Sequence, residues 1–482
     1  MTIYSRRAAL AGLAATGAAL ALPRGAHAQA QALRLPSGEE LVAAAQLGGE
    51  VTYVVADAKT GLVLEARGAD RPMAPASTAK TITSLYALET LGGGYRFATR
   101  LIATGPIAGG KVQGDLILAG GGDPTLDTDG LDDLAARLAA AGVSGITGRF
   151  RTWGGALPYA DRIAADQPEW VGYNPAISGL ILNYNRVCFA WKRAQGGYAL
   201  GMDARGARSQ PKVYTVDVAL ANRKGPLFSY AQRGGKEQWT VAAGALGKGG
   251  TRWLPVRDPV AYAGDVFQTL ARARGVPLPA PEPVQALPGG TVIAERRSDA
   301  LPGVLRDMMK YSTNLTAEAV GMTASTARGE AAARGRSGAV MSAWLSARMG
   351  GSKARFVDHS GLGADDRISA LEMVRAVGVL GPKAGLRGLM KPFKLRDEKG
   401  NYRKEQALRV DAKTGTLNFV STLTGYVTAP DGTELIFAIF TGDLARRARA
   451  KNDEEPAGSG AWVRRSKVLQ SQLLERWATL YG

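Results

Sequence analysis

Apolar positions recur at strand or helix spacing along most of the chain, and the two periods divide it into stretches. Residues 51–56 and 62–66 alternate like strands on either side of a polar turn, which predicts a hairpin. From about 99 to 259, short alternating segments are separated by glycine-rich turns, which indicates a mainly β region. Helical spacing then returns, and it predicts helices at 260–274, 301–328, 331–349 and 369–380.

The last part of the chain predicts a sheet and a closing helix. Strand patterns cover 407–417, 421–427 and 434–440, and a helical pattern covers 461–480. That helix has an apolar stripe, which predicts packing on the sheet; its members are Leu469, Leu473, Trp477 and Leu480. The basic residues Arg464, Arg465 and Lys467 leave a membrane-surface role as the alternative.

A helix that carries a candidate nucleophile and base is predicted directly after Pro75. Apolar residues at Ile82, Leu85, Leu88 and Leu91 give it a face to bury. Ser77 and Lys80 are three residues apart and therefore lie on one helical face, so a desolvated Lys80 could act as base for Ser77. The alternative is a capping serine beside a solvated lysine.

A second S-x-x-K, Ser209 to Lys212, contains Pro211, which disfavours the helical turn that would bring its two side chains together.

Two further motifs follow the Ser77 helix in order. Ser312-Thr313-Asn314 is the one S-x-N in the chain, and it is predicted at the start of a helix. Lys413-Thr414-Gly415 lies in a predicted strand and is followed by Thr416. Another K-T-G, Lys59 to Gly61, falls in the turn of the first hairpin, where we expect it to face solvent.

Residues 1–28 have the pattern of an export signal. Ser5-Arg6-Arg7 precedes a small, apolar run that ends in Ala26-His27-Ala28, a cleavage-site pattern. The paired arginines favour the twin-arginine route, with an ordinary Sec signal as the alternative. Removing 1–28 takes away Arg6, Arg7 and Arg24, and the net charge falls from +18 to +15.

Composition excludes several classes of function. The chain has 482 residues, of which 45% are hydrophobic and 21% charged, as in a soluble protein of several domains, and no later stretch is long enough to span a membrane. A basic, exported protein suits an anionic partner such as cell wall, whereas scattered Lys and Arg without a basic-aromatic module do not indicate nucleic-acid binding. Cys188 is the single cysteine and His359 the single histidine after residue 28, so a disulfide or a multi-histidine zinc site is not expected.

The motif set S-x-x-K, S-x-N and K-T-G resembles that of penicillin-binding proteins and serine β-lactamases. Further segments resemble the class C low-molecular-mass penicillin-binding proteins, the D-alanyl-D-alanine carboxypeptidase/endopeptidase family. These segments are 114–118 with 120–126, 174–180 with 182–185, and 358–362 with 367–369. The resemblance covers the chain after residue 28 almost end to end.

The resemblance implies an α/β (α+β) fold, in which a β-lactamase/DD-peptidase-like catalytic domain has an antiparallel sheet with helices on both faces. Because Lys80 and Ser312 are 232 positions apart, it also implies two inserted, mainly β domains between them. The expected boundaries are 29–98 and 260–482 for the catalytic domain, 99–182 and 235–259 for inserted domain II, and 183–234 for inserted domain III.

The resemblance also implies roles for the motif residues, without any metal or cofactor. Ser77 would attack the carbonyl of the penultimate D-alanine, with Lys80 as base and Ser312 as proton relay. Lys413 would keep the site positive, and Thr414 and Thr416 would hold the substrate carboxylate. Gly415 would also belong to the substrate-binding residues, and Asn314 would hydrogen-bond the substrate amide. The backbone N–H groups of Ser77 and Thr416 would form the oxyanion hole.

The expected function is therefore that of a periplasmic serine DD-peptidase, with its signal cleaved near Ala28. Its expected partners are peptidoglycan peptides, and β-lactam antibiotics as covalent inhibitors, while loose association with the membrane or wall stays open. A serine β-lactamase is one alternative, but no class A E-x-x-x-N motif is present. A non-catalytic peptidoglycan-binding protein is another, and a Ser-His-Asp hydrolase using His359 is the most distant.

One segment departs from the family pattern. Gly363-Ala364 stands where relatives continue Ser-Arg, which puts any contact of that arginine with the peptide stem in doubt. His359 also occupies a position where relatives often have a small residue. We expect it to be a surface loop histidine rather than a catalytic one.

Overall fold

The computed structural model describes residues 35–330, 334–450 and 452–482. The predicted export signal lies outside these residues. Within the described ranges, the model has no helix that combines the length and apolarity needed to cross a membrane.

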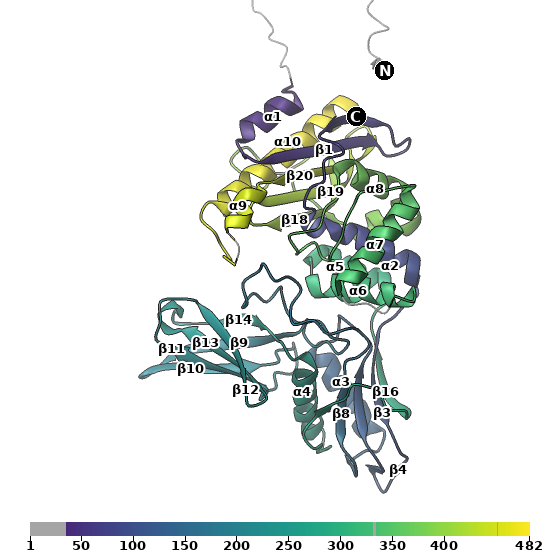
Figure 1. Cartoon of the computed structure of the whole chain (residues 1–482), viewed down its shortest axis with the longest axis vertical. Helices are drawn as coiled ribbons and strands as arrows, with labels where there is room; N and C mark the ends of the chain where they lie inside the picture. Colours follow the sequence, from purple (N-terminus) through teal and green to yellow (C-terminus); the bar gives the residue numbers. More distant parts are fainter. Residues whose placement is uncertain (1–34, 331–333, 451) are drawn as a thin grey trace, which may run out of the picture. The chain divides into compact units, whose positions relative to one another are not determined.

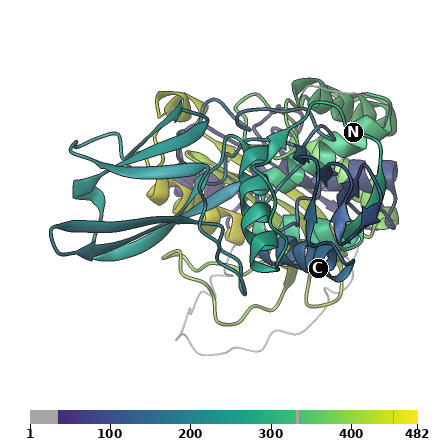
Figure 2. The same cartoon turned by 90° about the horizontal axis from the view of Figure 1, so that it is seen from below.

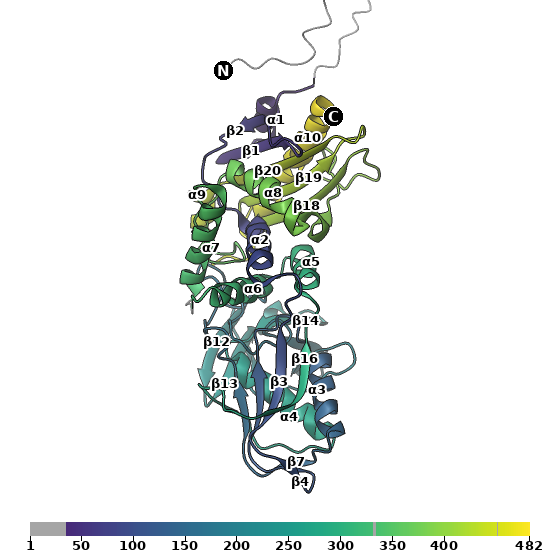
Figure 3. The same ribbon diagram turned by 90° about the vertical axis from the view of Figure 1, so that its right-hand side faces the viewer.

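A six-stranded antiparallel sheet combines two strands from the first part of the chain with four strands from its last part. Its order is β17-β18-β19-β20-β1-β2, and the central strands can be followed across it in Figure 3. The strands are β1 (Glu50–Asp57), β2 (Val63–Arg67), β17 (Lys391–Pro392), β18 (Arg409–Leu417), β19 (Val420–Thr428) and β20 (Glu434–Gly442). The hairpin and the three late strands predicted from alternation are confirmed.

Both faces of this sheet are covered by helices, as predicted (Figure 1). One face carries α1 (Gly38–Ala45) and α10 (Ser459–Tyr481); the other carries α2 (Ala79–Leu91) and α8 (Ala370–Ala384), with α5 (Leu301–Tyr311), α6 (Asn314–Ala327) and α7 (Arg334–Met349) packed around α2. Successive side chains of β1 face opposite ways, so Val54 packs with the α2 side and Val55 with the α10 side.

Three of the four residues in the predicted apolar stripe of the closing helix are buried against the sheet, and the fourth, Leu480, is exposed. Leu469, Leu473 and Trp477 are fully buried and share a core with Val55 and Phe437. The predicted packing of this helix is therefore confirmed in preference to a membrane-surface role for the same stripe.

The segment between α2 and α5 builds separate sheets. A five-stranded sheet has the order β15-β8-β6-β3-β16, from β3 (Ala98–Ala103), β6 (Leu116–Gly120), β8 (Phe150–Trp153), β15 (Glu282–Pro283) and β16 (Thr291–Arg297). Helices α3 (Thr128–Ala140) and α4 (Pro259–Ala273) belong to its core, and a small sheet joins β4 (Ile107–Ala108), β5 (Lys111–Val112) and β7 (Gly145–Ile146).

Two three-stranded sheets, coloured teal at the left of Figure 2, follow in the chain. One has the order β10-β9-β14 and the other β11-β13-β12. The strands are β9 (Arg186–Ala194), β10 (Gly197–Asp203), β11 (Val216–Ala221), β12 (Phe228–Arg233), β13 (Lys236–Ala242) and β14 (Gly249–Pro255). Short elements complete the fold: α9 (Leu444–Arg449) and the 3₁₀ turns η2 (Ala76–Thr78), η3 (Ala243–Ala245) and η4 (Leu386–Leu389).

Strand pairing links segments on either side of two of the expected domain boundaries, and the boundaries themselves stay predictions. Residues 260–297 were expected in the catalytic domain, but β16 pairs with β3, and Phe267 of α4 packs on Phe150 of β8. Residues 235–259 were expected in inserted domain II, but β13 pairs with β11 and β12, and β14 pairs with β9. The cause is physical: periodicity predicts an element but not the sheet to which it belongs.

Candidate active site

A tight turn presents Ser77 ahead of helix α2. The carbonyl of Pro75 accepts hydrogen bonds from Thr78 Oγ1 at 2.6 Å and from Thr422 Oγ1 at 2.7 Å, which ties the turn to strand β19. Ala76 has a φ of 46°, a sparsely populated conformation for a residue with a side chain. Such strain persists only where the surroundings enforce it.

Lys80 lies one turn further on and is fully buried. Its Nζ donates to Ser77 Oγ at 3.0 Å, to Asn314 Oδ1 at 2.8 Å and to the carbonyl of Ser360 at 2.7 Å. Burial lowers the pKa of Lys80 to about 8, against the opposing charge of Asp358. A substantial fraction of Lys80 is therefore neutral near pH 8, as a base for Ser77 requires.

Ser312 and Asn314 stand where helix α5 gives way to α6. Ser312 has a φ of 58° and separates the two helices, so the predicted helix start falls at Asn314. Ser312 Oγ accepts from Lys413 Nζ at 2.9 Å. Asn314 accepts from Lys80 and donates through Nδ2 to the carbonyl of Tyr173 at 3.0 Å.

Strand β18 forms the opposite wall. Lys413 is fully buried, and its pKa is lowered well below the usual range by burial first and by the charges of Lys80 and Lys391 next. Its Nζ also donates to the carbonyl of Thr414 at 2.6 Å. A Cβ on Gly415 would lie 2.1 Å from Thr422 Oγ1 and 2.9 Å from the Ser77 nitrogen, so only glycine allows the strand to approach the serine turn this closely.

These walls enclose a cleft of about 760 Å³. Ser77, Ser312, Asn314 and Thr416 line it, as the motifs predict. The structure adds side chains that sequence reasoning missed: Gln167 and Tyr173 from the insertion, and the segment from Glu454 to Gly460. The one sequence signal near them was the 174–180 segment, which begins directly after Tyr173.

The rim of the cleft is held by charges from the insertion. Both carboxylate oxygens of Glu454 accept from Arg252 at 2.8 Å, and one also accepts from Trp170 Nε1 at 2.8 Å. Beside it, Arg447 donates to Asp166 at 3.0 Å.

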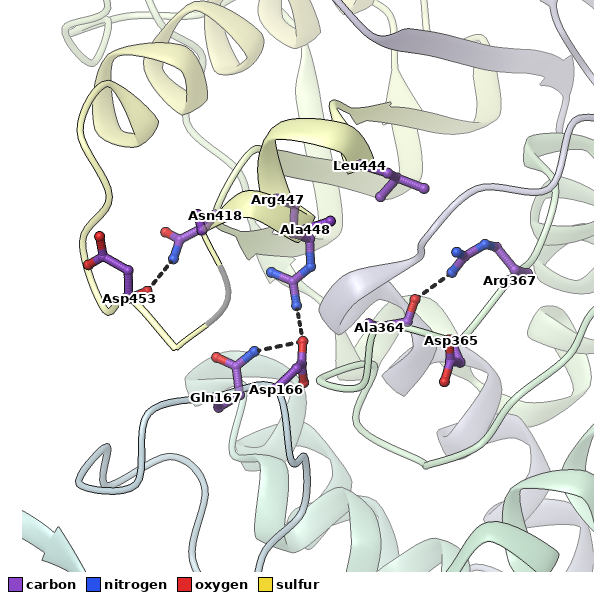
Figure 4. Close-up of a pocket in the computed structure, with 11 residues that line it drawn as sticks. Asp166, Gln167, Ala364, Asp365, Arg367, Asn418, Leu444, Arg447, Ala448 and Asp453 are labelled. Carbon is purple, nitrogen blue, oxygen red and sulfur yellow. Dashed lines mark hydrogen bonds and ion pairs between the residues drawn. The ribbon is translucent and has the colours of Figure 1, made fainter.

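Figure 4 shows that contact within a pocket of about 290 Å³, which Gln167 and Asn418 share with the cleft. Ala364, where the family resemblance led us to expect arginine, also lines this pocket.

The second copies of the motifs lie elsewhere. Ser209 Oγ donates to Asp132 Oδ2 at 2.8 Å, and Lys212 lies over the ring of Tyr214. Lys59, Thr60 and Gly61 form an exposed turn, as predicted.

His359 is fully buried, so the prediction of a surface histidine is wrong. Its Nε2 is 2.7 Å from Ser337 Oγ, and its ring stacks on Tyr86. The sequence does not indicate this burial, because Gly321, against which the imidazole packs, is distant in the chain.

The fold and this constellation define a serine peptidase of the penicillin-binding class, and the comparisons name the family. Residues 38–460 match the D-Ala-D-Ala carboxypeptidase 3 (S13) family, and the chain belongs to it. It is 30% identical over 428 residues to the D-alanyl-D-alanine carboxypeptidase of Actinomadura sp. (strain R39), covering 80% of this chain and 76% of that protein. It is 29% identical over 424 residues to carboxypeptidase DacB of Mycolicibacterium smegmatis, covering 84% and 79%.

The fold is similar to the crystal structure of penicillin binding protein 4 (dacB) from Haemophilus influenzae. The TM-score is 0.71 at 21% identity, covering 91% of this chain and 99% of that one. The predicted family, the fold class and the class of enzyme, a D-Ala-D-Ala carboxypeptidase, are thereby confirmed.

Proposed function

We propose that this carboxypeptidase cleaves the D-alanyl-D-alanine bond of peptidoglycan stem peptides through an acyl-enzyme on Ser77. The observation that carries the proposal is the buried Lys80 Nζ, 3.0 Å from Ser77 Oγ and with its pKa lowered to about 8. Ser77 Oγ bonds the carbonyl carbon of the penultimate D-alanine as its proton passes to Lys80. The C–N bond then breaks and the amine of the leaving group takes up a proton.

Ser312 is the group we assign to that second proton transfer. Ser312 lines the cleft together with Ser77. Its hydroxyl accepts a hydrogen bond from Lys413 Nζ at 2.9 Å, so in this proposal Lys413 also lies near the leaving group. Water then attacks the ester carbonyl, gives its proton to the lysine base and releases Ser77.

The wall formed by β18 supplies substrate binding in this proposal. Lys413 gives the positive field for the substrate carboxylate, and Thr414 and Thr416 hold it. The N–H groups of Ser77 and Thr416 stabilise the oxyanion, which the close approach of Gly415 to the Ser77 nitrogen supports. Asn314 holds the substrate amide.

We also propose DD-endopeptidase activity, in which the amine of the acceptor strand of a cross-linked peptide leaves in place of the terminal D-alanine. The cleft supports this because its walls extend beyond the motif residues to Tyr173, Gln167 and the 454–460 segment. Purified cross-linked muropeptide dimers are the test. Release of D-alanine with all dimers intact would remove the endopeptidase half of the proposal.

The partners and the location follow from the same chemistry. Peptidoglycan peptides are the substrates and β-lactams the covalent inhibitors, acting in the periplasm after removal of the signal at 1–28. Penicillin binding protein 4 (dacB) from Haemophilus influenzae, which has a similar fold, has been solved in complex with a β-lactam, and this supports the use of β-lactams as probes.

A fluorescent penicillin separates the proposed function from its alternatives. Stable labelling supports a DD-peptidase, because deacylation of a penicilloyl-serine is then slow. Rapid turnover of the label would indicate a serine β-lactamase. No label at all would indicate a non-catalytic peptidoglycan-binding protein.

A further inference from the structure

A loop of the insertion forms one wall of the cleft. Residues 161–174 contain no helix or strand, and they lie between Ala160 and Ile177, which pair in an isolated antiparallel bridge. The side chains of Gln167 and Tyr173 from this loop line the cleft. Because the loop has no ladder of backbone hydrogen bonds, other groups must fix the path of its chain.

Tyr173 of this loop also contacts a motif residue. Its carbonyl accepts a hydrogen bond from Asn314 Nδ2 at 3.0 Å, while Asn314 Oδ1 accepts from Lys80 Nζ at 2.8 Å. The Tyr173 hydroxyl donates to Gln167 Oε1 at 3.2 Å, which joins the two loop side chains that line the cleft. A shift of the loop would therefore move a wall of the cleft and also withdraw a partner from Asn314, the group that we place at the substrate amide.

Arg257 holds this loop from inside the insertion. It is only 5% exposed, and its guanidinium donates to three backbone carbonyls of the loop. Nη1 donates to the carbonyls of Asp161 at 2.7 Å and Asn174 at 2.9 Å, and Nη2 donates to the carbonyl of Glu169 at 2.6 Å. These carbonyls include the first and the last residue of the loop, so a single side chain sets the path of the whole segment.

The backbone of Arg257 is itself fixed by its neighbours. It lies between strand β14 and helix α4, and its nitrogen donates to both carboxylate oxygens of the buried Glu237 on strand β13, at 3.0 and 2.9 Å. The next nitrogen, that of Asp258, donates to the same carboxylate at 2.8 Å, and the Asp258 side chain caps helix α4. The guanidinium therefore projects from a well-fixed part of the insertion toward a loop that has no regular structure.

We propose that Arg257 is a positioning residue that fixes the 161–174 loop as a wall of the cleft and thereby determines how tightly the stem peptide is held. The inference rests on the proposed function, in which that peptide acylates Ser77. The bonds of Lys80 to Ser77 and to the Ser360 carbonyl do not involve the loop. Arg257 should therefore affect KM for a long substrate more than kcat.

The test compares the release of D-alanine from two substrates by the full chain. One is a full-length stem peptide that ends in D-alanyl-D-alanine, and the other is acetyl-D-alanyl-D-alanine, which is too short to extend along the loop. Arg257→Met removes the donors to the loop and should raise KM for the stem peptide about five- to tenfold, with kcat within about twofold. Both constants for the short substrate should stay within about twofold of wild type.

Arg257→Lys is the conservative variant. It keeps the buried charge, but its single nitrogen cannot reproduce the fork of a guanidinium, so KM for the stem peptide should rise only about threefold. If Arg257→Lys keeps the wild-type KM for the stem peptide, the inference is overturned. If wild type releases D-alanine from neither substrate, the proposed function fails, and the inference fails with it.

Arg223→Met is the matched control. Arg223 belongs to the same insertion and also holds backbone carbonyls, those of Pro226 at 2.7 Å and Thr240 at 3.0 Å, but these lie outside the 161–174 loop. Its loss should leave KM for both substrates unchanged. Equal increases of KM in Arg223→Met and Arg257→Met would overturn the inference, because they would indicate a general weakening of the insertion.

A double variant decides the point even if Arg257→Met does not fold. Tyr173→Ala removes a side chain through which Arg257 is proposed to act, so adding Arg257→Lys to it should raise KM for the stem peptide by less than about 1.5-fold. A further threefold rise in the double variant would show that the two residues act independently, and it would overturn the inference.

Discussion

The two S-x-x-K segments of this chain have the same letters and opposite surroundings. Lys80 is fully buried and bonded to Ser77, whereas Lys212 is exposed and Ser209 donates to Asp132. The two K-T-G segments differ in the same way, since Lys413 is buried behind Ser312 and Lys59 lies in an exposed turn. Burial, which lowers the pKa of a lysine, is what separates a chemical site from a solvated repeat of its motif.

The largest difference between the two S-x-x-K segments is expected at their serines. We expect Ser77→Ala to abolish the covalent penicillin adduct, because it removes the nucleophile, and Ser209→Ala to leave the adduct unchanged. Peptide mapping by mass spectrometry after penicillin treatment gives the answer. An adduct that persists in Ser77→Ala would sink the mechanism.

The two lysines of the K-T-G segments give the next largest contrast. Lys413→Ala should slow acylation about 10- to 100-fold, because it removes the hydrogen bond from Lys413 Nζ to Ser312 Oγ and the side chain that we place beside the substrate carboxylate. Lys59→Ala should change the rate by less than about twofold, since an exposed turn lysine contributes little. Equal losses from both would show that the substrate carboxylate binds elsewhere.

The sequence could single out the motif residues because each belongs to a short motif within or directly beside a regular element. Ser77 lies in the turn that leads into the helix of Lys80, and Lys413 lies on strand β18. The catalytic roles assigned to them stay predictions. The letters could not show that Ala76 adopts a positive φ, because tertiary contacts with the Gly361 loop impose it.

Other features depended on contacts that no local pattern encodes. Tyr173 reaches Asn314 across 141 positions of chain, and Glu454 reaches Arg252 across 202. The same holds near the boundaries expected at 235 and 260, because no local pattern encodes the pairing of β16 with β3 or of β14 with β9. His359 looked like a loop residue because its loop is short and polar, yet the loop folds inward around Asp358.

The pH dependence of acylation should also distinguish a buried lysine base from an exposed one. Because the folded-state pKa of Lys80 is lowered to about 8, the neutral base is the minor form below that pH and the major form above it. Acylation should therefore rise nearly tenfold per pH unit below about 8 and level off above it. Stopped-flow measurement from pH 6 to 9 tests this, and a flat profile would mean that Lys80 is not the base. An unperturbed lysine, with a pKa of about 10.4, would place that limb more than two pH units higher.

The smallest effect is expected at the rim, where two neighbouring glutamates again differ in surroundings. Glu454 is held by Arg252 and Trp170 of the insertion, whereas Glu455 is exposed. Glu454→Gln should loosen the 454–460 wall of the cleft at a cost of about 0.5–1 kcal/mol, the range of a partly exposed ion pair, and so slow dimer cleavage about two- to fivefold. Glu455→Gln should cause no such loss.

A small penicillin reacts at Ser77 and needs little of that wall, so its acylation rate should be the same in both glutamate variants. Dimer cleavage measured by chromatography beside penicillin acylation therefore separates the rim from the chemistry. A loss of acylation as large as the loss of cleavage in Glu454→Gln would show that the insertion acts on the Ser77 turn itself rather than on the hold of a large substrate.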